Sequence, residues 1–247
     1  MSWALWHDGF PDQATRTADR ALLHAREFGH TYTLAYTLWL TAIPAVLSRD
    51  VLVLERLANE DATISTQYGF RFGRAYSDVQ LGWAAAHRGQ GADCIDRMRR
   101  GIAAATAIGA RWLDPFHLGL VAEALALVGE VAEGLAELDQ ALARSTESGE
   151  KWADAELHRL RGDLLCRLAR PDLDNAERSF RVALSIAREQ GTRGFELRAA
   201  TSLARLLGDH GRREEARQLL TPVYGSFTEG FDTADLKDTK ALLTELA

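Results

Sequence analysis

Glycines recur along this chain at a nearly constant interval, and that interval limits what the chain can fold into. Successive members of the main series stand 40, 40, 40, 42 and 39 residues apart: Gly29, Gly69, Gly109, Gly149, Gly191 and Gly230. A second series falls near the middle of the intervals: Gly9, Gly89, Gly129 and Gly211, with Ser48 where a glycine would be expected between the first two. A fixed period of about 20 to 50 residues is typical of repeat architectures.

Between the glycines the apolar residues follow a helical period. Leu157, Leu160 and Leu164 share one face of a helix, and Ala176 and Phe180 begin the apolar face of the next. No stretch alternates between apolar and polar residues as a strand does. Glycine just beyond a helix is the usual left-handed cap. The sequence therefore predicts an all-α fold in which each unit is a helix, a turn, a second helix and a stop.

The period divides the chain into one domain, 1–247, of about six helical hairpins and a final capping helix. The expected repeats lie near 1–29, 30–69, 70–109, 110–149, 150–191 and 192–230, and the capping helix near 232–246. In this register Ser2–Asp8 is the end of a first helix whose opening turns are missing. Solenoids need covered ends, so we expect either a longer polypeptide or a homodimer in which Trp3, Leu5 and Trp6 pack on a second copy.

An aromatic residue opens the first helix of most repeats. The series comprises Tyr32, Phe72, Trp112, Trp152 and Phe195. Such rings either pack one repeat on the next, which we favour, or form a row of exposed stacking platforms along one rim.

The pattern resembles the tetratricopeptide repeat over nearly the whole chain. The small residue near the end of the first helix appears as Gly82 and Gly162. The small position of the second helix is filled in five repeats by Ala14, Cys94, Gly134, Ala176 and Ala216. The period of about forty residues exceeds the thirty-four of the standard repeat. The resemblance implies a right-handed α-solenoid.

The C-terminal stretch 223–237 carries a narrower resemblance. It is similar to the tail of bacterial proteins in which a class III adenylate or guanylate cyclase domain, or a DNA-binding domain, precedes an ATPase module and a repeat array. No cyclase or ATPase motif is present, so this resemblance concerns the array alone, and it implies that any cyclase or ATPase domain would lie upstream in a longer polypeptide.

The composition and the absence of known motifs argue against several classes of protein. The formal charge of −6 argues against a nucleic-acid binder, no apolar run could span a membrane, and two cysteines, Cys94 and Cys166, favour a reducing cytoplasm. Only three of the 29 basic residues are lysines, so arginine dominates. The chain has no phosphate-binding glycine loop and no nucleophile, base and orienter in one motif, and its seven histidines are scattered over the repeats. We expect no catalysis, no cofactor and no metal.

In tetratricopeptide arrays the first helix of each pair builds the concave wall, and that register gives the candidate binding residues. They are Tyr76, Trp83, Phe116, Glu123, Glu156, Arg159, Asp163, Arg198 and Arg205. The arginines and acids could grip a carboxylate or a phosphorylated small molecule, or they could form an internal ion-pair network on a solvated groove. We expect a ligand- or protein-binding sensor or scaffold module of a larger bacterial signalling protein. It would take a protein or peptide partner or a small-molecule effector. The alternative is a free-standing adaptor that binds a peptide or a partner helix.

Overall fold

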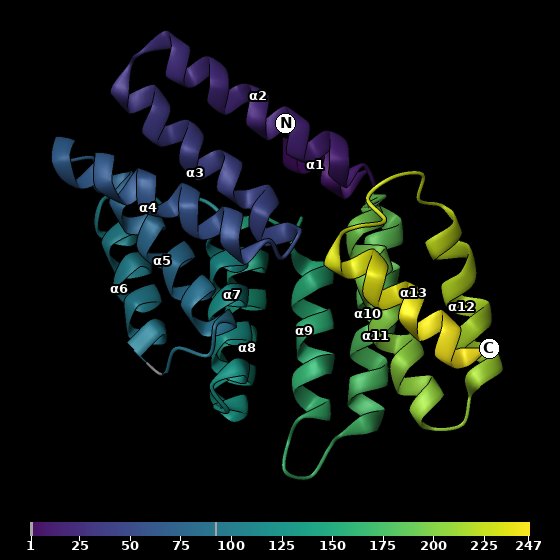
Figure 1. The fold of residues 1–247 in the computed structure, drawn as a ribbon. Coiled ribbons are helices and arrows are strands. Elements are labelled where there is room, and N and C mark those ends of the chain that lie inside the picture. Colours follow the sequence, from purple (N-terminus) through teal and green to yellow (C-terminus); the bar gives the residue numbers. More distant parts are fainter. Residues whose placement is uncertain (1, 92) are drawn as a thin grey trace.

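The computed structural model describes residues 2–91 and 93–247, and these residues form thirteen α-helices and no strand (Figure 1). The predicted all-α class is confirmed. The helices are α1 (Ser2–His7), α2 (Pro11–Phe28), α3 (Thr31–Leu47), α4 (Val51–Tyr68), α5 (Arg71–His87), α6 (Asp93–Ala107), α7 (Asp114–Leu127), α8 (Val131–Ser148), α9 (Asp154–Cys166), α10 (Leu173–Gln190), α11 (Arg193–Asp209), α12 (Arg213–Gly225) and α13 (Ala234–Leu246).

Helices break beside the evenly spaced glycines because these residues adopt a left-handed backbone. Gly29, directly after α2, has φ 71° and its N–H donates to the carbonyl of Arg26, and Gly149 after α8 has φ 78°. Between α3 and α4 the left-handed residue is Arg49, with φ 55°, and not Ser48. The final helix begins at Ala234, two residues later than expected, because Thr233 is extended.

The helices form two rows. Each odd-numbered helix from α1 to α11 packs closely against the next odd-numbered helix. The even-numbered helices pack closely only on their neighbours along the chain and meet one another through ion pairs such as Arg26–Glu60. The odd row is therefore the inner one. It curls until α1 also meets α11, so segments from opposite ends of the chain lie side by side (Figure 1).

Aromatic side chains pack between odd-numbered helices, including the contact between α1 and α11. The rings of Trp39 and Phe72 have centroids 4.9 Å apart, and Trp6 packs edge-to-face on Phe195 at 5.2 Å. Trp3 similarly meets Trp152. The chain itself therefore packs on the aromatic residues of α1, and Trp6 is buried while Trp3 is partly buried.

The aromatic series divides between core and surface. Phe195 is buried, Phe72 and Trp152 are partly buried, and Tyr32 and Trp112 are about half exposed. The buried and partly buried rings pack against neighbouring helices, as Phe72 does against Trp39, whereas about half of Tyr32 and of Trp112 faces solvent. Across the described residues, no helix combines the length and the apolar character needed to cross a bilayer.

Candidate binding pocket

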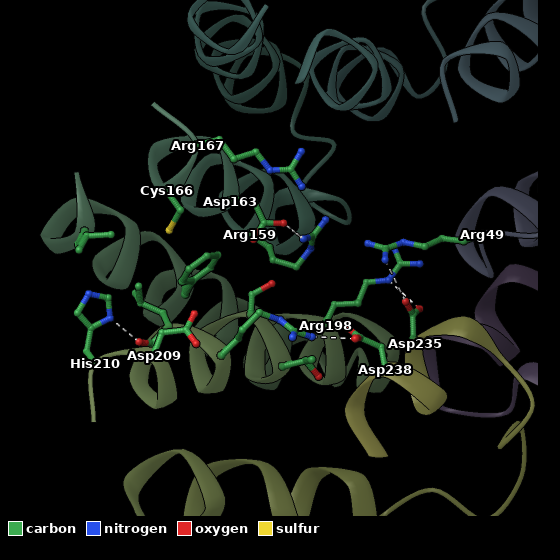
Figure 2. A pocket seen from close by; sticks show the side chains of 16 residues that line it. Arg49, Arg159, Asp163, Cys166, Arg167, Arg198, Asp209, His210, Asp235 and Asp238 are labelled. Carbon is green, nitrogen blue, oxygen red and sulfur yellow. Dashed lines mark hydrogen bonds and ion pairs between the residues drawn. The ribbon is translucent and has the colours of Figure 1, made fainter. Parts of the chain in front are cut away.

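A pocket of about 460 Å³ lies among α9, α10, α11 and α13, and the turn between α3 and α4 reaches into it (Figure 2). Its apolar lining comes from Leu173, Phe180 and Leu206. Its charged lining comprises five arginines, Arg49, Arg159, Arg167, Arg198 and Arg205, and four aspartates, Asp163, Asp209, Asp235 and Asp238. The volume falls in the range of small-molecule sites.

Arg198 on α11 ties three separate parts of the chain together. Its Nη1 donates to Glu156 of α9 at 3.0 Å and its Nε donates to Asp235 of α13 at 2.8 Å. Its Nη2 donates to the backbone carbonyl of Leu47 at the end of α3. The guanidinium also lies 5.0 Å from the ring centroid of Trp6, a cation–π distance. One side chain thus links the first helices of the chain to the last ones.

Arg159 completes the floor of the pocket. Its Nε and Nη2 each donate to Glu156 at 2.8 Å, and its Nη1 donates to Asp163. The Arg159 side chain is only 3% exposed. Burial alone would raise the pKa of Glu156, but the guanidiniums of Arg159 and Arg198 outweigh it and bring that pKa down to about 2. Glu156 is therefore a fixed anion between two fixed cations.

Four of the nine predicted site residues line this pocket: Arg159, Asp163, Arg198 and Arg205. Glu156 lies beneath them as the shared partner of two arginines. The structure thus brings the charged residues of α9 and α11 together. The two alternatives from the sequence, an internal ion-pair network and ligand binding, apply to different residues. Arg159 and Arg198 belong to the ion-pair network, whereas Arg205 is exposed and lines the pocket.

The aromatic candidates lie elsewhere, in the core. Tyr76 and Trp83 are each 1% exposed, and Phe116 is 5% exposed. Tyr76 donates from its hydroxyl to the carbonyl of Trp112, and Trp83 donates from Nε1 to Glu123 at 2.7 Å. The three aromatic candidates therefore do not face an open groove, and the fourth residue predicted from this part of the chain, Glu123, is 17% exposed and accepts the bond from Trp83.

Sequence reasoning missed the lining residues that come from turns and from the last helix. Asp235 and Asp238 of α13 and Arg167 after α9 lie outside the register used for the concave wall. Arg49 could have been found, because it stands 40 residues after Gly9 and 40 before Gly89. A residue other than glycine at a position where the forty-residue period places glycine would have marked Arg49 as a candidate site residue.

The pocket offers guanidinium donors and carboxylate acceptors. Burial, followed by the nearby Asp163, raises the pKa of the Cys166 thiol at its edge, which makes the reactive thiolate scarcer. Within residues 2–91 and 93–247, no group of three or more His, Cys, Asp or Glu side chains is arranged to hold a metal ion.

No protein-family model matches the chain. It is similar to an uncharacterized protein of Rhizobium meliloti (strain 1021), with 26% identity over 206 residues. The matched region is 83% of this chain but only 20% of that relative, so the chain spans about a fifth of the length of the protein it matches.

Proposed function

We propose that this chain is a tetratricopeptide-like right-handed α-solenoid that serves as the binding and sensing module of a longer signalling protein. The two rows of helices, with contacts between successive odd-numbered helices, support the solenoid. The match to a fifth of a much longer relative supports a place within a larger chain. The cyclase- or regulator-linked ATPase suggested by residues 223–237 is our candidate for the rest of that chain.

One observation carries the proposal: charged side chains from distant parts of the chain line a single pocket. Arg49 comes from the second repeat, Arg159 from the fifth, Arg198 from the sixth and Asp235 from the final helix. A ligand in this pocket would contact elements that otherwise meet only where the helix row closes. Because a ligand favours the conformation that binds it best, it would favour the closed curl over more open ones. A neighbouring output domain would read that difference in shape.

The test is isolation of the protein from its own host under conditions that preserve complexes, followed by native mass spectrometry. We expect an added mass of a small molecule that Arg167→Ala removes. Arg167 is an exposed pocket residue, so its loss should leave the fold intact. The matched control is Arg26→Ala, which breaks an exposed pair with Glu60 on the outer row and should keep the added mass.

Small-angle scattering of the same sample then tests the sensing step. Removal of the ligand should change the overall dimensions of the protein. Unchanged dimensions would refute the shape readout. A protein partner that co-purifies and is unaffected by Arg167→Ala would instead favour the free-standing adaptor. Recovery with neither a small molecule nor a partner would refute both functions.

A further inference from the structure

Arg49 occupies a backbone position that favours glycine. The turns on the same forty-residue ruler have Gly9 at φ 89° and Gly89 at φ 70°, and Arg49 stands between them at φ 55°. A residue with a Cβ atom is disfavoured in this left-handed region, and arginine is not among the residues that tolerate it best. Backbone conformations of this kind cluster at functional sites. We therefore expect a function that requires an arginine side chain at this position.

The side chain of Arg49 points into the pocket, as Figure 2 shows. Its Nη1 lies 3.7 Å from Asp235, an ion pair too long for a hydrogen bond. Among the residues that the structure describes, its guanidinium makes no hydrogen bond. The same holds for Arg167, and Arg205 makes a single one, to Asp238 at 2.7 Å. These three arginines keep N–H donors available.

The other two arginines differ in this respect. Arg159 and Arg198 each donate from all three guanidinium nitrogens to protein acceptors. They form a fixed floor, and Arg49, Arg167 and Arg205 line the same pocket with hydrogen-bond donors left over. The carboxylates that pair with the floor are Glu156, Asp163 and Asp235, so the charges of Arg159 and Arg198 are already balanced within the protein. The hydrogen-bond donors left for a ligand are therefore those of Arg49, Arg167 and Arg205.

Size and apolar surface define the rest of the ligand. The pocket of about 460 Å³ is far larger than a bare inorganic anion needs, and Leu173, Phe180 and Leu206 give part of it an apolar wall. A guanidinium binds a planar carboxylate or a phosphate through paired hydrogen bonds.

We infer that this pocket binds a small organic anion whose carboxylate or phosphate group is held by Arg49, Arg167 and Arg205 while its apolar body lies against Phe180 and Leu206. The inference rests on the proposed binding function and names its ligand class. Because Arg49 belongs to the turn between α3 and α4, the bound anion also fastens that turn to α9 and α11.

Three probes that share one ring test the charge requirement. Benzoate presents a carboxylate, phenyl phosphate presents a phosphate, and benzamide is the neutral counterpart. Each is titrated into the full chain at constant ionic strength set with chloride, and binding is followed by calorimetry and by the melting temperature. We expect saturable binding of at least one anion and none of benzamide. The tighter of the two anions identifies the oxyanion that the site prefers.

Variants locate the binding. Arg49→Gly should weaken the anion about tenfold or more, because it removes a charged hydrogen-bond donor, and it should not lower the melting temperature, because glycine suits φ 55°. Arg167→Ala should weaken it similarly, and Arg26→Ala should leave it unchanged.

Equal affinity for benzamide and benzoate, or full affinity in Arg49→Gly, would overturn the inference. Binding of benzamide alone would overturn the anion while leaving the proposed binding function in place. Failure of both anions to bind would also overturn the inference. The proposed binding function would then be decided by native mass spectrometry of the protein isolated from its host.

Discussion

Arg198→Met is the most informative single substitution, because it removes a buried charged side chain that links the first helices of the chain to the last ones. It takes away the bonds to Glu156 and Asp235 and the bond to the carbonyl of Leu47. Methionine has no charge, but its flexible chain fills most of the same space. The apolar contacts around Trp6 are otherwise kept.

The expected loss follows from burial. The side chains of Arg198, Glu156 and Asp235 are 7%, 10% and 11% exposed. Removing one partner of a buried ion pair typically costs about 3–5 kcal/mol, because a charge is left in low dielectric. Here Arg159 still holds Glu156, and Arg49 stands 3.7 Å from Asp235, so we expect the lower end, about 3 kcal/mol. For a chain of this length that corresponds to a fall of roughly 6–12 °C in melting temperature.

Urea denaturation followed by circular dichroism measures the loss. The matched control is Arg205→Met, an arginine on the same helix whose pair with Asp238 is about half exposed, and it should change stability by less than about 1 kcal/mol. Hydrogen exchange adds a local readout, since amides in α1 and α11 should lose protection before those in α5 and α6. If Arg198→Met were no less stable than Arg205→Met, apolar packing of Trp6 and Phe195 would close the row and the reasoning would fail.

Three other predictions concern pH and two glycines. Burial, joined at His7 by the charge of Arg198, lowers the pKa of His7 and His117 to about 4 from 6.5, so the unfolded chain binds protons that the folded chain does not. Stability should therefore fall as the pH drops from 6.5 toward 4, by about 3 kcal/mol between pH 7 and 5, and urea titrations of a His7→Phe, His117→Phe double variant should show a flatter profile. An equal slope in both proteins would contradict this account. Gly149→Ala should cost about 1–2 kcal/mol through its φ of 78° alone, since its Cβ would meet nothing within 4 Å. Gly162→Ala should cost about 1–3 kcal/mol because its Cβ would meet Phe180, and an unchanged melting temperature in either variant would refute the corresponding reason.

Much of the local structure could be predicted from the sequence. A glycine after each hairpin predicts a helix stop, and Gly29, Gly149 and Gly191 all adopt the left-handed conformation. The small positions of the repeat were also predicted, and one of them, Gly82, lies so close to α6 that a Cβ there would be 2.7 Å from the carbonyl of Cys94. These features are local, because backbone sterics and the helical period act over a few residues.

The pocket could be predicted only in part. The charged residues of α9 and α11 share one face of each helix, so their pattern indicates which way they point. The aromatic candidates Tyr76, Trp83 and Phe116 follow the same register but are buried. Whether an inward-pointing residue lines a groove or a core depends on how tightly the row curls at that point.

The sequence by itself determined the all-helical class, the helix ends and the inward faces, since each depends on neighbours along the chain. Only the tertiary structure decided that α1 meets α11, that Arg198 reaches Leu47, and that Arg49 enters a pocket built by the last repeats. The physical reason is that small rotations between successive helix pairs accumulate along the row. Each rotation is set by side-chain packing at one crossing, and their total decides which distant segments touch.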